Sequence, residues 1–182
     1  MVTASFLSPA QLVGYVALVL GVAAFSQRSD TRLKVLIACE SIAYVVHFIL
    51  LGNYPASSSA LVSCVRMLVS IRSRSPWWIA VFIVINVAFG AAFASSALGW
   101  LPITASCLAT VGVFVLQGLP LRLVLLVCTL LWLVNNAFSG SIGGTVLEAL
   151  IALSNLATIS RLVAERVARR RASAPGALAE AG

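Results

Sequence analysis

Four side chains that could do chemistry interrupt long apolar runs of this sequence: Glu40, His47, Arg66 and Glu148. A charged group at bilayer depth costs about 2.5–3.5 kcal/mol on insertion scales, so each charge needs a partner or water. Carboxylates, an imidazole and a guanidinium can bind ions or polar solutes, and they can equally join helices through buried hydrogen bonds. These residues therefore indicate either a solute or ion path or a set of structural contacts between helices.

The spacing of polar residues in four of the apolar runs is regular. Each of these runs carries two polar residues seven positions apart, which in a helix share one face and lie about 10 Å apart along the axis. Counting depth from the basic ends of the runs predicts two polar levels. The inner level contains Glu40, Arg66, Thr129 and Asn155, and the outer level contains His47, Ser59, Asn136 and Glu148. The predicted substrate-pathway residues are Glu40, His47, Arg66, Asn136, Glu148 and Asn155.

Glu40 and Arg66 lie in consecutive antiparallel runs joined by a tight turn, so an ion pair between them is expected on geometric grounds. Such a pair could be a structural contact between two helices or part of a solute or ion path. His47 could respond to protons, because an imidazole titrates near neutral pH, or it could be a hydrogen-bonded packing residue. The asparagines could line a polar cavity or bond between helices.

The composition identifies the elements that must position these residues. Of 182 residues, 61% are hydrophobic and 9% are charged, with a mean hydropathy of +1.07, against roughly 45–50% and 25% in soluble domains. Apolar runs of about 20 residues cross a bilayer as helices, because no water is present there to bond to the backbone. An all-α polytopic membrane protein with seven transmembrane helices is predicted. Its spans are Pro9–Ser26, Leu33–Leu51, Tyr54–Ile71, Trp77–Ala97, Pro102–Gln117, Leu121–Phe138 and Ile142–Arg161.

Positive charge is distributed unevenly along the chain. The net charge is +7, and eleven of the twelve Lys and Arg residues fall in alternate gaps between the apolar runs, at the ends of the runs beside those gaps, or in the C-terminal tail. The positive-inside rule therefore places the N-terminus outside and the C-terminus in the cytoplasm. Basic residues beside helix ends predict contact with anionic lipids of the bilayer at the cytoplasmic face and argue against nucleic acid. No Lys or Arg precedes the first run, so a cleavable signal peptide is not expected.

The seven runs repeat a pattern of three. Runs one to three and five to seven share the order helix, basic loop, helix, tight Gly-containing turn, helix, and pairing position i with i+89 aligns Cys39 with Cys128. An odd number of helices per unit plus one linking helix gives both units the same orientation, which predicts two parallel triple-helix bundles in a 3+1+3 layout. The expected single transmembrane domain covers 1–161, with repeat 1 at about 9–72, the linker helix at about 77–97, repeat 2 at about 102–161, and a basic, partly disordered cytoplasmic tail at 162–182.

Motifs for other classes of chemistry are missing from the sequence. It contains no Gly-x-Ser-x-Gly, His-Glu-x-x-His or phosphate-loop motif, so an enzyme is not expected. Cys39, Cys64, Cys107 and Cys128 lie inside apolar runs without metal-ligand spacing, which predicts neither a metal site nor a disulfide. No cofactor is expected. Nothing in the sequence requires a monomer, and an oligomer is compatible with it.

Dispersed motifs between Gly14 and Arg161 carry a resemblance to a known family. In chain order they are Gly14–Tyr15, Phe25–Ser26–Gln27, His47 followed by Leu50–Leu51–Gly52, Arg66, Leu101–Pro102, Trp132–Leu133 with Asn135, Gly140–Ser141 with Gly143, and Ser154–Asn155 up to Arg161. At these residues the chain resembles the YgjV-type family of bacterial inner-membrane proteins. Membership implies a location in the bacterial inner (plasma) membrane.

The 3+1+3 layout also resembles the SWEET and PQ-loop (MtN3-like) superfamily of sugar and amino-acid carriers, in which two triple-helix bundles enclose a central pathway. The chain departs from that superfamily in having no Pro–Gln dipeptide. Arg66 and Asn155 occupy places comparable to its pathway-lining residues, and an arginine there would favour an anionic or carboxylate-bearing solute unless Glu40 neutralises it. A small polar or anionic solute is the expected partner. The resemblance implies a small-solute carrier or exporter with a polar midplane pathway. The alternative is a non-transporting membrane scaffold, receptor or regulator whose buried polar residues are structural.

Overall fold

The computed structural model describes residues 6–25, 27, 30–73 and 75–179. Seven α-helices occur in these ranges: α1 (Pro9–Phe25), α2 (Asp30–Leu50), α3 (Tyr54–Arg72), α4 (Trp77–Phe93), α5 (Trp100–Val115), α6 (Gly118–Phe138) and α7 (Ile142–Ala179). A short 3₁₀-helix, η1 (Ala97–Gly99), precedes α5, and the described residues contain no strand. The all-helical class and the number of helices agree with the sequence prediction.

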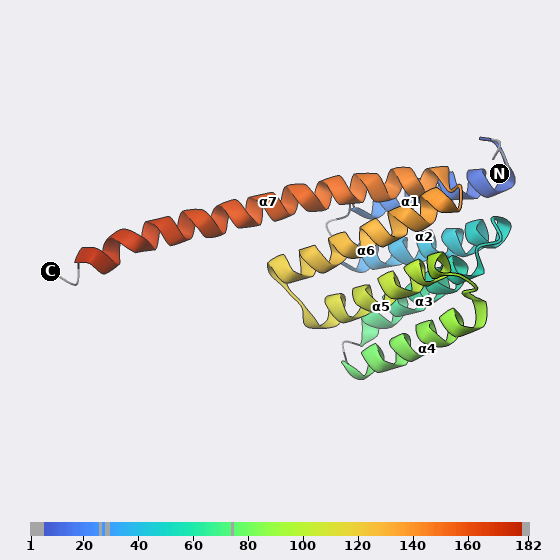
Figure 1. Ribbon diagram of the computed structural model, residues 1–182, viewed down its shortest axis with the longest axis horizontal. Helices are drawn as coiled ribbons and strands as arrows, with labels where there is room; N and C mark the ends of the chain where they lie inside the picture. The colour runs from blue at the N-terminus through green and yellow to red at the C-terminus, as the bar shows by residue number, and fades with distance from the viewer. Residues whose placement is uncertain (1–5, 26, 28–29, 74, 180–182) are drawn as a thin grey trace.

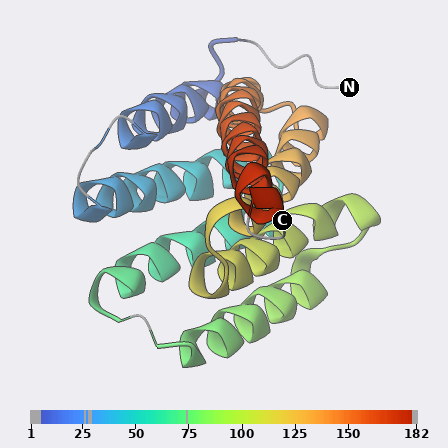
Figure 2. The same ribbon diagram turned by 90° about the vertical axis from the view of Figure 1, so that its left-hand side faces the viewer.

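The helices lie roughly side by side and alternate in direction along the chain (Figure 1). Six of them form a closed ring of neighbours, in the order α1, α2, α3, α5, α6, α7 and back to α1. The remaining helix, α4, lies outside this ring against α3 and α5 (Figure 2). Residues that face the middle of the ring therefore come from both halves of the chain.

Tight turns connect α2 to α3 and α6 to α7. Gly52 and Gly140 both have a φ of 71°, a left-handed conformation that glycine adopts without a steric penalty. After the first turn Asn53 caps α3, because its Oδ1 accepts a hydrogen bond from the backbone N–H of Ala56 at 3.1 Å. These turns keep consecutive helices adjacent, so that polar residues on the two helices can lie at the same depth.

Polar side chains lie inside the ring of helices, and large apolar side chains lie outside it. Gln11 and His47 are fully buried, whereas Val84 and Leu153 are 66% and 65% exposed. The buried apolar cluster consists of Ala17, Tyr44, Phe48, Ala56, Ala60 and Leu147. An apolar exterior around a partly polar interior is what a chain surrounded by lipid requires, and it is the reverse of a soluble domain.

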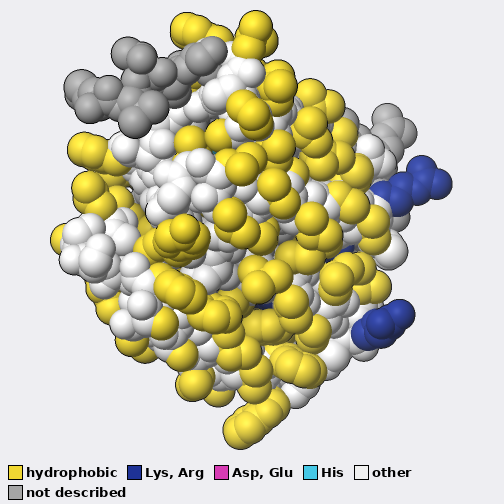
Figure 3. Space-filling model, turned by 90° about the vertical axis from the view of Figure 1, so that its right-hand side faces the viewer, with side chains coloured by type: hydrophobic (Ala, Val, Ile, Leu, Met, Phe, Trp, Pro, Cys, Tyr) yellow, Lys and Arg dark blue, Asp and Glu magenta, His cyan; other side chains and the backbone are white. Residues whose placement is uncertain are grey.

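Charge separates the two ends of the helix bundle. The α2–α3, α4–α5 and α6–α7 connections lie at one end, whose face shows mainly hydrophobic and uncharged side chains, with the projecting Lys and Arg side chains at its edge (Figure 3). The start of α2 and the end of α3 lie at the opposite end, where Lys34 Nζ donates to the carbonyl oxygen of Ser70 at 2.8 Å. The charge partition on which the predicted orientation depends is therefore present in space, while the orientation itself stays a prediction.

Three helical segments are long and apolar enough to cross a membrane, judged by length and composition: Ala97–Val115, Gly118–Phe138 and Ile142–Ala168. Two shorter apolar helices cover Pro9–Ala24 and Trp77–Phe93. Charged residues interrupt the other two helices, α2 and α3. These features support a helical membrane protein, and the crossing of the bilayer by all seven helices stays a prediction.

Two helix ends differ from the predicted spans by four residues or more, and the other boundaries differ by three or fewer. The helix α4 ends at Phe93 rather than Ala97, because Ala94 leaves the helical region with φ −82° and ψ 104° before the chain enters η1. The helix α7 continues past Arg161 to Ala179, because the residues beyond Arg161 are mostly Ala and Arg, which favour helix. Hydropathy alone misplaces an end where an apolar sequence turns or where a polar sequence remains helical. The division into a transmembrane domain and a partly disordered tail stays a prediction.

Candidate functional site

Four of the predicted pathway residues line one cavity of about 140 Å³, which we call the central cavity. It lies inside the ring between α2, α3, α6 and α7, and its lining includes Glu40, Tyr44, Arg66, Trp132, Asn136 and Glu148. Glu40 and Arg66 belong to the predicted inner level, whereas Asn136 and Glu148 belong to the outer one. The two polar levels are therefore not separate in the folded chain, because members of both meet at this cavity.

Arg66 is 5% exposed and joins α3 to α5. Its Nη1 donates to the carbonyl oxygen of Ser106 at 2.9 Å and to Thr110 Oγ1 at 2.6 Å, and its Nη2 donates to Ser63 Oγ at 3.2 Å. The expected ion pair with Glu40 is absent from the described part of the chain. That expectation was wrong because α5 packs against α3 and offers the guanidinium closer acceptors.

The two carboxylates of the central cavity have no hydrogen-bond or ion-pair partner among the described residues. Both side chains are half-buried, and Glu40 Oε1 lies opposite Gly21, where an added Cβ would be 3.1 Å from it. Three other atoms of lining residues, Tyr44 Oη, Arg66 Nε and Asn136 Oδ1, are buried and unpartnered. Leaving buried polar atoms unpaired is costly, so this cavity has the character of a binding site rather than of a satisfied polar contact.

A second cavity, which we call the side cavity, has a volume of about 500 Å³ and shares Trp132 and Glu148 with the central cavity. Its lining comes mostly from apolar side chains of α6 and α7 and includes the predicted residues Thr129 and Asn155. Asn155 Nδ2 donates to the carbonyl oxygen of Arg122 at 3.1 Å, and its buried Oδ1 is unpartnered. Glu148 therefore lies where a polar chamber meets a largely apolar one.

His47 does not line these cavities, although it was predicted with them. It is fully buried, with Nδ1 2.6 Å from the carbonyl oxygen of Ala10 and Nε2 2.7 Å from Ser141 Oγ. Because a carbonyl oxygen only accepts, Nδ1 donates, and in a neutral ring Nε2 accepts from the serine hydroxyl. His47 thus joins α1, α2 and the α6–α7 turn, which is the packing role that the sequence left open.

Gln11 also joins α1 to the α6–α7 turn, and sequence reasoning did not identify it. Its Nε2 donates to the carbonyl oxygen of Gly140 at 2.6 Å, and its Oε1 accepts from the backbone N–H of Ile142 at 3.1 Å. The available signal was that a glutamine near the start of an apolar run needs a partner.

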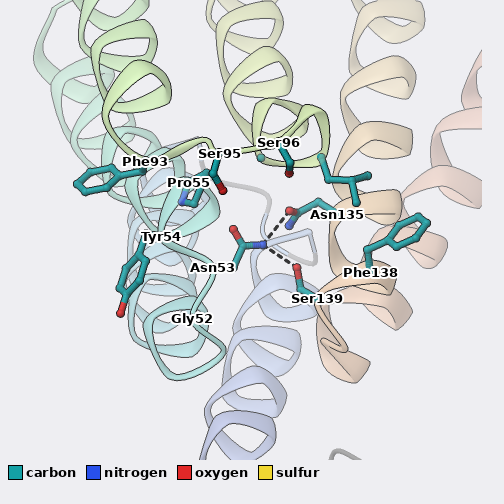
Figure 4. A pocket seen from close by; sticks show the side chains of 12 residues that line it. Gly52, Asn53, Tyr54, Pro55, Phe93, Ser95, Ser96, Asn135, Phe138 and Ser139 are labelled. Atoms are coloured by element: carbon teal, nitrogen blue, oxygen red, sulfur yellow. Dashed lines mark hydrogen bonds between the residues drawn. The ribbon is translucent and has the colours of Figure 1, made fainter. Parts of the chain in front are cut away.

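A third cavity lies at the end of the bundle that carries the charge-free connections, and we call it the end cavity (Figure 4). Its volume is about 310 Å³. At its wall Asn53 Nδ2 donates to Asn135 Oδ1 at 2.9 Å and to Ser139 Oγ at 2.6 Å, which links the α2–α3 turn to the end of α6 (Figure 4). Asn135 Nδ2 is buried and unpartnered. Sequence reasoning did not identify this role of Asn53, because an asparagine in a turn is normally interpreted as a helix cap and its long-range partners cannot be predicted.

No cluster of three or more His, Cys, Asp or Glu residues suited to a metal ion occurs in the part of the chain that the structure describes. The four cysteines are free thiols. The polar groups around the cavities are instead carboxylates, amides, hydroxyls and one guanidinium. Such a set can bind polar or charged solutes through hydrogen bonds and charge.

The apolar outer surface, the long apolar helices and the polar cavity between the helices define a helical integral membrane protein. A family model described as a bacterial inner membrane protein, Imp-YgjV, matches residues 8–166. Inner membrane protein YgjV of Escherichia coli (strain K12) is 37% identical to this chain over 152 residues, which is 84% of this chain and 83% of that protein. The chain therefore belongs to the YgjV family of bacterial inner membrane proteins, which confirms the resemblance seen in its dispersed motifs. No solved structure matches the chain.

Proposed function

We propose that this protein is a small-solute carrier or exporter of the bacterial inner membrane, with a polar midplane pathway. The observation that carries this proposal is the central cavity, where Glu40 and Glu148 have no described partner and three further buried polar atoms are unpaired. Polar groups held inside a membrane without partners are costly, and a bound solute or water would satisfy them.

The pathway is proposed to lie between two parallel triple-helix units, α1–α3 and α5–α7, linked by α4, with all seven helices crossing the bilayer. The order of neighbours in the ring supports this arrangement, because exchanging α1, α2 and α3 with α5, α6 and α7 leaves that order unchanged. The position of α4 outside the ring also suits a linking helix. An internal repeat is the simplest source of such an order.

We further propose that the N-terminus lies outside and the C-terminus in the cytoplasm, where the basic helix ends contact anionic lipids. On this proposal the end cavity opens to the outside. Asn53 of the first unit bonds to Asn135 and Ser139 of the second unit there, and these bonds would have to break for a solute to pass between the units.

The orientation can be tested by labelling two exposed serines after replacement by cysteine. Ser96→Cys lies in the α4–α5 connection and Ser75→Cys lies between α3 and α4. In cells with a permeabilised outer membrane, a membrane-impermeant maleimide should label Ser96→Cys strongly and Ser75→Cys only after lysis. The unmodified chain provides the background from its four native cysteines. The reverse labelling pattern would overturn the orientation.

Transport can be tested by solute flux into proteoliposomes that contain the purified protein. Panels of radiolabelled amines, amino acids, sugars and organic acids should include a class with saturable uptake above that of empty liposomes. Glu148→Gln should lower this uptake by about tenfold or more, because a charged lining group is lost. Glu165→Gln, on the exposed part of the same helix, is the control that should leave uptake unchanged. If uptake of all four classes is no faster than the leak into empty liposomes, the carrier proposal is excluded.

A second candidate is a non-transporting membrane scaffold, receptor or regulator. The bonds of His47 and Gln11 favour it, because they join three parts of the chain without reaching a cavity. In such a protein Glu40→Gln would change thermal stability in detergent and no flux would be found. Catalysis is not part of either proposal, since the sequence carries no enzyme motif.

A further inference from the structure

We propose that the central and side cavities together bind an organic monocation, with its positively charged head between Glu40 and Glu148 and its apolar body in the side cavity. This inference rests on the proposed carrier function for its biological purpose, and it names the class of solute. It departs from the anionic solute that an arginine in the pathway would favour.

The charge of the central cavity favours a cation. Glu40 and Glu148 are two carboxylates without described partners, and one guanidinium, that of Arg66, lines the same cavity. Both terminal nitrogens of Arg66 already donate to Ser63 and to acceptors on α5, so the guanidinium is held in place by its own contacts. When all three groups are ionised the cavity carries one net negative charge. A monocation would neutralise it.

Two of the three unpaired atoms of the cavity wall, those of Tyr44 and Asn136, favour the same kind of ligand. Tyr44 is 9% exposed and Asn136 is 1% exposed, and the hydroxyl of the first and Oδ1 of the second have no hydrogen-bond partner. Both residues line the central cavity. An amide oxygen only accepts hydrogen bonds and a tyrosine oxygen can accept them. The third unpaired atom, Arg66 Nε, is a donor. A ligand that carries N–H donors or a diffuse positive charge complements the two acceptors, which lie in the same wall as the two carboxylates.

Aromatic rings complete the wall of the central cavity. The Tyr44 and Phe48 rings stack with centroids 5.4 Å apart, and the Phe48 and Trp132 rings stack with centroids 5.9 Å apart. All three residues line the cavity. Ring faces attract cations, and aromatic walls are a recurrent means of holding alkylated ammonium groups. Carboxylates together with aromatic rings thus favour an ammonium-type head over a simple metal ion.

The side cavity provides room for the rest of such a ligand. It is more than three times as large as the central cavity, at about 500 Å³ against about 140 Å³, and its lining includes Leu125, Leu147 and Ile151. Trp132 and Glu148 belong to both linings. A cation whose head lies at Glu148 can therefore place an apolar body against α6 and α7, where its burial adds affinity.

The test is calorimetric titration of the purified full-length protein in detergent with benzyltrimethylammonium. Benzoate and benzyl alcohol carry a similar apolar body without positive charge, and tetramethylammonium carries the head without the body. We expect saturable binding of benzyltrimethylammonium, weaker binding of tetramethylammonium, and no binding of the other two. Equal binding of benzoate, or no saturable binding of benzyltrimethylammonium to the folded protein, would overturn the proposal.

Substitutions assign the binding to the two carboxylates. Glu40→Gln and Glu148→Gln should each weaken benzyltrimethylammonium binding by about thirtyfold, because each removes one buried charge partner. Glu148→Asp keeps the charge and should recover much of the affinity, and Glu165→Gln on the exposed part of α7 should bind as the unmodified protein does. Thermal midpoints in the same detergent identify a variant that has lost its fold. If the folded Glu40→Gln and Glu148→Gln variants bind benzyltrimethylammonium with unchanged affinity, the cation does not bind between these two carboxylates.

The binding test and the flux test can fail separately. Binding is measured without a membrane, so a protein that binds the cation but moves no solute would overturn the carrier and leave the site in place. A protein that moves another class of solute without binding benzyltrimethylammonium would overturn the cation site and leave the carrier in place.

Discussion

Replacing Arg66 by alanine should lower the free energy of unfolding by about 3 kcal/mol, the largest effect expected of a single substitution in this chain. The guanidinium is 5% exposed and makes three hydrogen bonds, two of them to α5. Its removal leaves a hole between α3 and α5. In a chain of this size the thermal midpoint in detergent should fall by roughly 6 °C or more.

Arg72→Ala is the matched control for this prediction, because Arg72 lies on the same helix and is exposed. It should change the midpoint little, since single exposed charges contribute little. Arg66→Lys should give an intermediate loss, because an ammonium group lacks the planar fork that reaches several acceptors. If Arg66→Ala melts like the unmodified protein, the contacts of Arg66 with α5 do not stabilise the bundle.

The second large effect is expected for Gly143→Ala, which should destabilise the protein by about 2 kcal/mol. A Cβ added at Gly143 would lie 2.6 Å from the carbonyl oxygen of Gly14 and 3.2 Å from the backbone nitrogen of Tyr15. Both atoms belong to the backbone of α1, so the clash cannot be relieved by a side-chain rotation. The helices α1 and α7 would have to separate, and the contacts that close the ring would weaken.

Gly112→Ala on α5 tests whether this loss is specific to the close approach of α1 and α7. Its added Cβ would meet only side-chain atoms of the next helix, the nearest being Val124 Cγ1 at 3.2 Å. Alanine favours helix over glycine by about 1 kcal/mol, so this variant should be neutral or more stable. Thermal melts of both variants in one detergent make the comparison. Equal midpoints would contradict the backbone contact at Gly143.

Much of the architecture could be predicted from hydropathy and from the turn residues between the apolar runs. Apolar runs, turn glycines and a turn asparagine predict helices whose starts at Pro9, Tyr54, Trp77 and Ile142 coincide with the observed ones. These features are local, because a helix satisfies its own backbone wherever its neighbours lie. The predicted span ends at Ala97 and Arg161 differ from the ends of α4 and α7, because hydropathy and helix formation diverge there.

The sequence predicted most of the residues that line the candidate site but not the hydrogen bonds that they make. Charged groups in apolar runs are few, so Glu40, Arg66 and Glu148 could be singled out, and the structure brings them to one cavity with Asn136. The partner of Arg66 could not be predicted, because it depends on α5 packing beside α3 across a long sequence separation. His47 was placed with the cavity but bonds elsewhere for the same reason.

The sequence by itself determined that this is a helical membrane protein. It also determined which residues interrupt the apolar runs and which family the chain resembles. Those properties depend on composition, spacing and motif order, which no packing can change. Only the tertiary structure decided that Arg66 is bound by α5, that the two carboxylates have no described partner, and that a polar cavity meets an apolar one at Glu148. The physical reason is that hydrogen bonds and cavities depend on side chains from helices far apart in the chain, and their positions follow from how the ring closes.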